Sequence, residues 1–478
     1  MSLHFFIRTL LVMLPFVTHA QFTEIVSNTS QLTPHWKNLA VPVTPALIGG
    51  YYYLKLDDKT FIKTTGQAGG TVQLTGFMDI PKIADYVGTS EYLYYSTYKE
   101  GKVFITRFDP IKQQHTPVRN SSRIFAEHEE SILVYSVFQH KIIVSCWYYD
   151  RSAGRTFVYV YAIHDNDPTA NAYLLSASVN QDGILDGRVG LSDDQVIAMY
   201  NLKKTGQEIK KVVYAFGFND TLKGNYSVKK NYDFTEIGLQ LNAVAGIGND
   251  ALFVLNNKKK IDAKEPGATS IWLLRNKSAK KLGDLQSVKT NSLSGTYQSG
   301  DFQFLKFDEA VYSYNTRTAL LKNVITLQPG ESLAYITPGQ QLQLRGDTLW
   351  CRVGTKQTDG NITYRLTWIL LTDPGLRHLV PGLPVHLTNS YWFEQRSIYY
   401  PYINGNCIYY CDEFAGNSAQ FFQYSLSTGQ VTKITPPSSP SLIYEGITEV
   451  VPIGSSLLMK AGYKSGKEKV IKTFLYRM

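Results

Sequence analysis

Apolar and polar residues alternate along most of this chain with a period of two, most clearly from Tyr51 to Phe77. In the first segment Tyr52, Leu54 and Leu56 fall on one face of an extended backbone, and the residues between them fall on the other. This period is typical of a strand with one buried face. An Asp-Asp-Lys turn and several glycines separate three such segments. We therefore predict an antiparallel meander of the kind that forms a β-propeller blade.

Similar groups of strands and turns recur along the chain, and helical periodicity is absent. They occupy residues 92–118, 141–178, 195–233, 251–285, 302–324, 348–380, 407–435 and 456–478. A spacing of roughly 35 to 60 residues is expected of propeller blades. Radial closure leaves only short exposed edges, and rings usually hold about four to eight blades. Because the group at 302–324 is irregular, the sequence predicts an all-β fold, a single propeller of eight four-stranded blades, with seven or nine as alternatives.

The two ends of the chain are predicted to close the ring together. The last group, 456–478, has only two strands of its own, and Phe22 to Ser27 is a strand-like segment that could supply its outer strand. The predicted organisation is thus a leader at residues 1–20, a lead-in at 21–45 and a propeller domain at 46–478.

Residues 1–20 have the pattern of a secretory signal peptide. His4 and Arg8 give a weakly basic start, Thr9 to Val17 is a short apolar run, and small residues lie at positions 18 and 20. The run is much shorter than the about 20 residues of a membrane-spanning helix, and no later stretch is apolar enough to span. We expect an exported protein that is not transmembrane and is periplasmic, on the cell surface or extracellular.

The composition narrows the range of binding partners that we expect. The net charge is +9, yet only 18% of residues are charged, and the excess lysines are scattered over turns. Without an arginine-rich segment or a nucleic-acid motif, we expect no nucleic-acid partner. Four cysteines in 478 residues indicate stabilisation by a large core and not by a disulfide framework. Cys146 and Cys351 could pair only if the fold brings them together. We expect a monomer.

The most specific local motif runs from Ser178 to Asp186 and resembles the calcium loops of integrin-type propellers, D-x-N-x-D-G-x-x-D. Calcium requires several oxygen ligands from one tight loop. Asn180, Asp182 and Asp186 are the candidate ligands, although Ser178 replaces the first aspartate and the motif occurs once. The alternative is an ordinary Asn- and Gly-rich connection between blades, without a cofactor.

Tyrosines are abundant, at 33 residues, and some aromatic clusters could stack on sugar rings. Trp147, Tyr149 and Trp392 are the candidate ligand-binding residues. The alternative is that these aromatic side chains fill the space between neighbouring blades.

Evidence for catalysis is sparse. The chain has no nucleophile elbow, zinc-protease motif or phosphate-binding glycine loop. His128-Glu129-Glu130, Asp193-Asp194 and Asp412-Glu413 are the nearest to catalytic groupings. Adjacent acids in a strand point to opposite faces, so they cannot form a catalytic pair with each other.

One hairpin carries a family resemblance. Residues 60–71, TFIKTTGQAGGT, resemble a repeat of the bacterial surface propellers built from Glu-Leu-Trp-x-x-Asp-Gly-Thr-x-x-Gly-Thr units. Gly66, Gly70 and Thr71 match, whereas Thr60, Ile62 and Thr65 replace the Glu, Trp and Asp of the unit. Residues 426–435, LSTGQVTKIT, similarly resemble the outer hairpin of many periplasmic propellers. These resemblances imply the propeller fold and a bacterial cell-envelope setting.

Three functions remain open on the sequence, the third being a structural surface or envelope component that binds no small ligand. The favoured one is an exported, non-enzymatic propeller that acts as a binding or scaffold module for a glycan or a protein partner. The alternative is a carbohydrate-active enzyme, a glycoside hydrolase or polysaccharide lyase, on the same scaffold. Two carboxylates about 5 to 9.5 Å apart at the mouth of the central channel, flanked by exposed aromatic residues, would favour the enzyme.

Overall fold

The structure is a computed structural model. The residues that it describes are 22–27, 45–56, 61–67, 69–74, 83–99, 102–119, 132–138, 140–150, 155–180, 189–191, 195–202, 210–217, 230–232, 239–247, 250–263, 265–275, 278–285, 293–333, 342–360, 362–380, 402–415 and 418–478.

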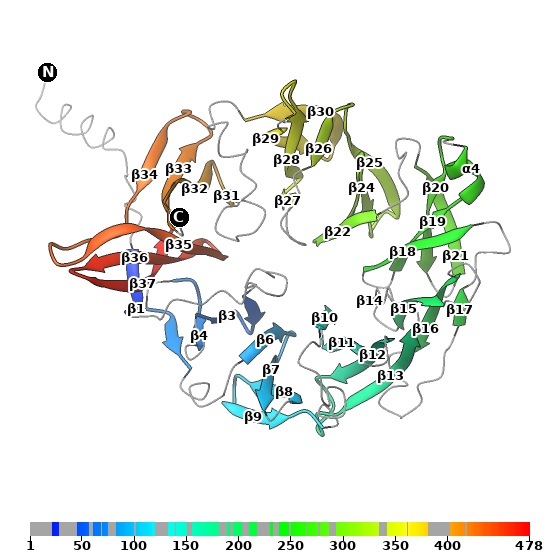
Figure 1. Cartoon of the computed structure of the whole chain (residues 1–478), viewed down its shortest axis with the longest axis horizontal. Coiled ribbons are helices and arrows are strands. Elements are labelled where there is room, and N and C mark those ends of the chain that lie inside the picture. Colours follow the sequence, from blue (N-terminus) through cyan, green and yellow to red (C-terminus); the bar gives the residue numbers. More distant parts are fainter. Residues whose placement is uncertain are drawn as a thin grey trace, which may run out of the picture.

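The described strands form antiparallel meanders arranged as a ring of blades around a central axis (Figure 1). Seven of the sheets are separate, and the eighth contains eight strands. A single residue pair, Ala419 with Ile447, joins the two halves of that eight-stranded sheet. Each half is itself a four-stranded meander, so the described strands form nine blades.

The first four blades lie between residues 46 and 232. Their strands are β2 (Ala46–Ile48), β3 (Tyr51–Lys55), β4 (Phe61–Thr64) and β5 (Thr71–Gln73); β6 (Ile83–Gly88), β7 (Leu93–Lys99), β8 (Lys102–Asp109) and β9 (Gln114–Pro117); β10 (Ile132–Phe138), β11 (Lys141–Asp150), β12 (Arg155–His164) and β13 (Ala172–Asn180); and β14 (Val189–Leu191), β15 (Gln195–Leu202), β16 (Lys210–Gly217) and β17 (Lys230–Tyr232).

The next three blades follow in chain order. Their strands are β18 (Gln240–Ile247), β19 (Asp250–Asn256), β20 (Thr269–Arg275) and β21 (Ser278–Asp284); β22 (Leu293–Ser299), β23 (Phe302–Phe307), β24 (Ala310–Asn315) and β25 (Leu320–Thr326); and β26 (Glu331–Leu333), β27 (Leu342–Arg345), β28 (Thr348–Lys356), β29 (Ile362–Leu370) and β30 (Asp373–Leu379).

The last two blades contain the C-terminus and the first strand of the chain. Their strands are β31 (Tyr402–Asn404), β32 (Cys407–Ala415), β33 (Ser418–Ser425) and β34 (Val431–Ile434); and β35 (Ile443–Ile453), β36 (Ser456–Ser465), β37 (Glu468–Arg477) and β1 (Phe22–Ser27).

The propeller prediction is confirmed, and the blade count is at the upper end of the predicted range. The irregular group at residues 302–324 is a complete blade, β22 to β25, so its exclusion from the count was wrong. In this blade β23 and β24 each contain five consecutive buried residues. Continuous burial removes the period of two that marks a strand with one solvated face, which explains the irregular pattern.

The ring closes as predicted, with both chain ends in one sheet. β1 pairs antiparallel with β37, from Phe22 opposite Tyr476 to Ser27 opposite Lys472. The Phe22 ring lies 5.8 Å from that of Phe474 and 5.0 Å from that of Tyr476, measured between centroids. Aromatic pairs at these separations stabilise a sheet beyond the effect of area burial.

The first blade corrects one detail of the sequence interpretation. The strand that begins at Tyr51 is the second of its blade, because the short β2 precedes it in the sheet order and pairs with its edge opposite β4. Its two faces are both covered: Tyr53 packs with Leu93 of the second blade, whereas Leu54 packs with Leu458 of the ninth. Blades packed face to face bury both sides of a strand, so the prediction of a half-buried strand was wrong at this position.

Helix is almost absent from the described residues. The exception is α4 (Lys258–Asp262), a short helix in the lysine-rich loop, where the Asn257 side chain accepts a hydrogen bond from the backbone amide of Lys260 as an N-cap. Among the described residues, no helix has the length and apolar character that crossing a bilayer requires.

Cysteines do not cross-link the described blades. Cys351, Cys407 and Cys411 form no disulfide. Cys351 is buried in β28 among the apolar residues of the sixth and seventh blades, so the pairing with Cys146 that the sequence left open is not formed.

Candidate functional site

Three of the predicted site residues lie at one end of the third blade. Trp147 and Tyr149 are in β11, and Asn180 is the last residue of β13. Tyr149 pairs with Thr156 of β12, which in turn pairs with Asn180. Tyr149 and Asn180 thus share one row across the sheet, about 10 Å apart at the usual strand spacing. Asp182, Asp186 and Trp392 lie outside the described residues.

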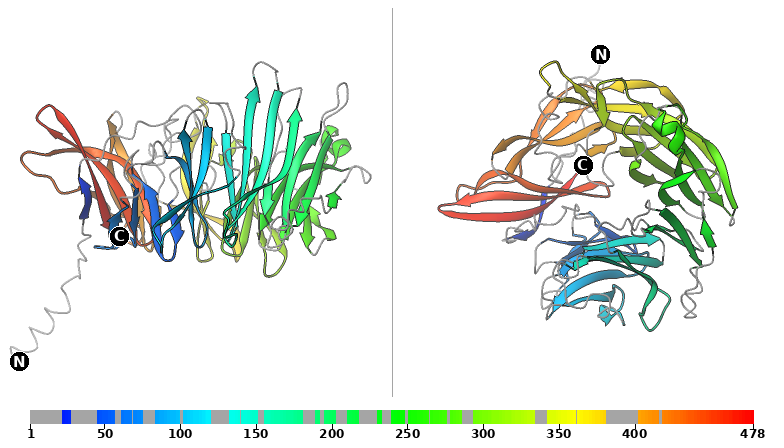
Figure 2. Two further views of the ribbon diagram at one scale, coloured as in Figure 1. Left: turned by 90° about the horizontal axis from the view of Figure 1, so that it is seen from below. Right: turned by 45° about the vertical axis from the view of Figure 1, so that its right-hand side comes forward.

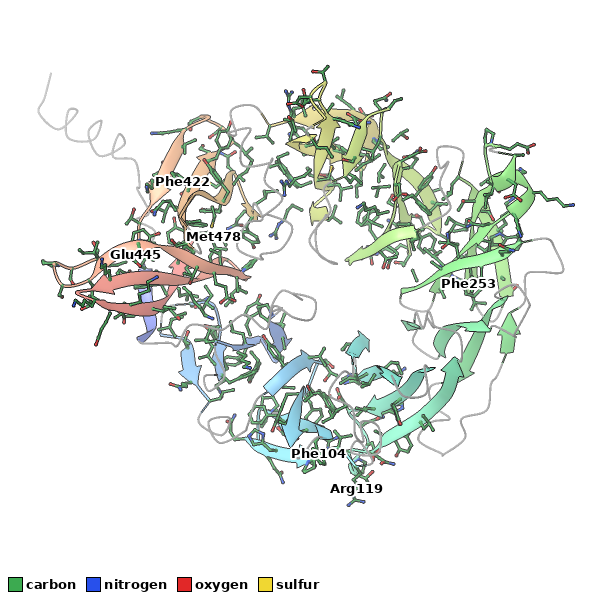
Figure 3. The ribbon with its side chains drawn as sticks, in the orientation of Figure 1. Phe104, Arg119, Phe253, Phe422, Glu445 and Met478 are labelled. Carbon is green, nitrogen blue, oxygen red and sulfur yellow. The ribbon has the colours of Figure 1, made fainter. Side chains whose placement is uncertain are left out.

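The opposite end of the same blade holds a group of polar residues that the sequence interpretation missed. It is formed by the β6–β7 turn of the second blade and by the β10–β11 and β12–β13 turns of the third. Glu91, His140 and Asp165 each offer a ligand atom within 4.8 Å of the others, and we call these three residues the junction cluster. The two blades also join through backbone, since Arg119 pairs with Asn171. Figure 3 shows Arg119 where these blades meet.

Asp165 is the buried member of the junction cluster. Its side chain is 1% exposed. Oδ1 accepts a hydrogen bond of 2.8 Å from the Tyr94 hydroxyl, and the backbone amide donates to the carbonyl oxygen of His140 at 2.9 Å. Oδ2 has no hydrogen-bond donor among the described residues. This buried oxygen instead faces Nδ1 of His140, 3.6 Å away.

His140 and Glu91 complete the cluster on the solvent side. Nδ1 of His140 lies 3.5 Å from Oε1 of Glu91, and the two side chains are 48% and 55% exposed. The Ser90 hydroxyl also contacts Nδ1, at 2.9 Å. A serine nucleophile relay needs the serine and the carboxylate on different ring nitrogens. Here the Ser90 hydroxyl lies closer to Nδ1, at 2.9 Å, than to Nε2, at 3.5 Å, and the carboxylates also face Nδ1, so the geometry is not that of a catalytic triad.

A buried arginine holds the Asp165 turn in place. Nη1 of Arg107 donates to the carbonyl oxygens of Asp165 and Asp167, at 3.3 and 2.9 Å, and the guanidinium lies 4.8 Å above the Tyr92 ring. The Asp167 carboxylate accepts hydrogen bonds from Thr169 and Tyr173 within the same turn. The turn is therefore fixed by bonds from both blades.

Burial dominates the electrostatics of this junction. It raises the pKa of Asp165, against the opposing effects of the nearby Thr89 hydroxyl, the hydrogen bond from Tyr94 and the His140 imidazole. Burial also raises the pKa of Tyr94, as does the adjacent Asp165. The pKa of His164 is lowered to about 4 by burial and by Lys141. In Asp167, burial is outweighed by the hydrogen bonds from Thr169 and Tyr173, and the pKa is lowered.

The two carboxylates of the junction cluster do not meet the criterion for a glycoside hydrolase. Glu91 and Asp165 approach each other closely, but Asp165 is buried behind His140 and cannot reach a glycosidic oxygen. What the cluster offers is an imidazole nitrogen and two carboxylate oxygens that converge on one point, a donor set for a metal ion.

The sequence signal for the junction cluster was weak. Its members come from three turns in two blades, and no motif joins them. Asp165 lies in the loop DNDPTAN, residues 165–171, whose sequence is that of an ordinary polar turn. The one available signal is positional, because Glu91 and His140 lie in the turns after the first strands of adjacent blades.

No protein-family model matches the chain, and no curated protein matches it. Among solved structures, it is similar to the WD40 domain of SCAP from fission yeast (TM-score 0.40, 10% identity, covering 96% of this chain and 94% of that one). It is similar to the polysaccharide lyase Uly1 (TM-score 0.33, 11% identity, 83% and 91% covered). It is also similar to a prolyl endopeptidase (TM-score 0.39, 10% identity), where the match covers 80% of this chain and 54% of that one. These similarities are too slight to carry an argument about function.

Proposed function

We propose that this chain is an exported, non-enzymatic β-propeller that binds a glycan at the end of the third blade that carries Trp147 and Tyr149. A protein partner is the second ligand class. The observation that carries the proposal is the length of this blade. β11 and β12 have 10 residues each and β13 has 9, compared with 5 and 4 in β3 and β4. The ninth blade has strands of similar length, with 11 residues in β35 and 10 each in β36 and β37, but it holds none of the predicted site residues.

The extra length lies at the end with the predicted site residues. At the other end, the Ser90 turn and the His140 turn are level, since their side chains form a hydrogen bond. The additional residues therefore extend away from that level, and Figure 2 shows cyan and blue-green strands that rise past their neighbours. Aromatic residues on a raised edge can offer flat apolar surfaces to sugar rings.

Titration of the mature chain against a panel of polysaccharides, by affinity electrophoresis, tests this proposal. We expect one or more glycans to retard the wild type, and the double variant W147A/Y149A to lose the retardation. The matched control is Tyr51→Ala, which removes an exposed tyrosine from the first blade. Equal retardation of the wild type and the double variant would place the binding elsewhere. New reducing or unsaturated sugar ends would favour the carbohydrate-active enzyme.

We also propose that the loop from Ser178 to Asp186 binds calcium, through Asn180, Asp182 and Asp186. The support is the spacing of these oxygen-bearing residues in the sequence. Calorimetry with Ca²⁺ should show one site in the wild type and none in D182N. Absence of heat from the wild type would remove the calcium site and leave the glycan proposal standing.

A further inference from the structure

We propose that Glu91, His140 and Asp165 form a transition-metal site of zinc type at the junction of the second and third blades. This site is independent of the proposed function, because it lies at the opposite end of the third blade from Trp147 and Tyr149. Three observations carry it: the donor atoms, the distances between them, and a buried carboxylate oxygen without a hydrogen bond.

The donor set selects the class of ion. Imidazole nitrogen with two carboxylate oxygens is a usual environment for zinc and related divalent transition metals. Calcium takes about six to eight oxygen ligands and has little affinity for nitrogen, so it fits this cluster poorly. Three protein ligands leave one tetrahedral position for water or another small molecule, the arrangement of an open zinc site.

The distances agree with a common ion. Ligand bonds of about 2.0–2.2 Å to tetrahedral zinc separate two ligand atoms by about 3.3–3.6 Å. Nδ1 of His140 lies 3.5 Å from Oε1 of Glu91 and 3.6 Å from Oδ2 of Asp165. Since Glu91 is more than half exposed, its side chain is free to close the remaining separation. The exposed Ser90 hydroxyl would turn away from Nδ1 when the metal binds.

The buried carboxylate oxygen is the observation that points to a ligand. Oδ2 of Asp165 is shielded from solvent and has no hydrogen-bond donor among the described residues. Burying a carboxylate oxygen unpaired is costly, and a cation bound to it would remove that cost. Oδ1 is meanwhile held by Tyr94, which fixes the carboxylate with Oδ2 directed at His140. Such orienting partners typically change metal affinity by about 10–100-fold.

Calorimetry with Zn²⁺ on the mature full-length chain, without a polyhistidine tag, tests the site. The wild type should bind one equivalent. H140A and E91Q should bind at least about 100-fold more weakly, since the loss of a ligand exceeds the loss of an orienting partner. Tyr94→Phe keeps the ring in place, removes only the bond to Asp165, and should weaken binding about 10-fold.

The controls separate this site from adventitious surface binding. Glu445→Gln and His378→Gln change a carboxylate and an imidazole in other blades and should bind Zn²⁺ as the wild type does. Co²⁺ should give the visible absorption of a tetrahedral centre in the wild type and not in H140A. Both cluster variants alter half-exposed side chains, and thermal melts without metal would show that they are folded. Unchanged binding in H140A and E91Q, or no binding by the wild type, would overturn the proposal.

Discussion

Two junctions of the ring differ in how they hold their blades together. The seam between the ninth and first blades is packed by apolar residues, among them Leu54, Ile62 and Leu458. The junction of the second and third blades also has an apolar centre, with Tyr94, Ile105 and Val144. Both junctions also carry buried charged groups. At the seam the Lys460 ammonium is paired with Glu449, whereas at the second junction Oδ2 of Asp165 is buried without a hydrogen-bond donor among the described residues. The difference between the two junctions is therefore in how completely their buried charges are paired.

The largest effect should come from removing the strand that closes the seam. Deletion of residues 21–30 removes β1 and leaves the rings of Phe474 and Tyr476 without the Phe22 contact. Loss of a packed phenylalanine alone costs about 3 kcal/mol or more. Urea unfolding should therefore show a much lower midpoint. An unchanged midpoint would mean that the seam does not depend on β1.

Lys460 is the buried charge of the seam. Its side chain is 5% exposed, pairs with Oε2 of Glu449 at 2.6 Å and donates to the carbonyl oxygen of Leu56 in the first blade. Lys460→Met leaves both acceptors without this donor and should destabilise the protein by about 3–5 kcal/mol. The double variant K460M/E449Q should recover part of the loss. If K460M matches the wild type in urea, the polar link across the seam contributes nothing.

The pH dependence of the free energy of unfolding should reveal the buried His164 at the junction of the second and third blades. His164 has a pKa of about 4 in the fold against 6.5 in the reference state. Between these values the unfolded chain binds a proton that the folded chain does not, so stability falls as the pH falls, by about 3 kcal/mol. Asp165, whose pKa is raised, acts in the opposite direction. The difference in free energy of unfolding between the wild type and H164Q isolates the contribution of the histidine. This difference should shrink on acidification from pH 6.5 to 4.

The smallest expected effect concerns the seam, where the backbone of the first blade closely approaches that of the ninth. Gly66 has a φ of +77°, and a Cβ there would lie 2.9 Å from the carbonyl oxygen of Ile453 in the ninth blade. Gly69 has a similar φ of +76° with nothing within 4 Å, which makes it a matched control. We expect Gly69→Ala to cost about 1 kcal/mol, from the backbone alone, and Gly66→Ala to cost more. Equal thermal shifts would argue against close packing of the blades.

The sequence predicted most of the fold, because strands and turns are local. The sequence pattern predicted two such features: the hairpin from Phe61 to Gln73, and the pairing of Phe22 to Ser27 with the C-terminal strand. The blade at Phe302 was discounted because its central strands are buried on both faces, which hides the two-residue period. Some innermost strands, such as Ala46–Ile48 and Val189–Leu191, have only 3 residues and are too short to give a pattern at all.

The site was much less predictable. Tyr149 and Asn180 came together because they belong to one blade, whose register follows from its hairpins. Glu91, His140 and Asp165 meet only because two blades pack at a particular angle and level, and single-chain patterns carry no information about that packing. The buried state of Asp165 is likewise a tertiary property, because its loop contains the polar residues of an exposed turn.

In this structure β1 and β37, from opposite ends of the chain, form one sheet that closes the ring. Hydrogen–deuterium exchange on the full-length chain tests this closure directly, by comparing amides of β1 with those of β37. We expect slow exchange in both strands, and faster exchange in β37 when residues 21–30 are deleted. Exchange of residues 22–27 within seconds, with β37 still protected, would contradict closure of the ring by its ends.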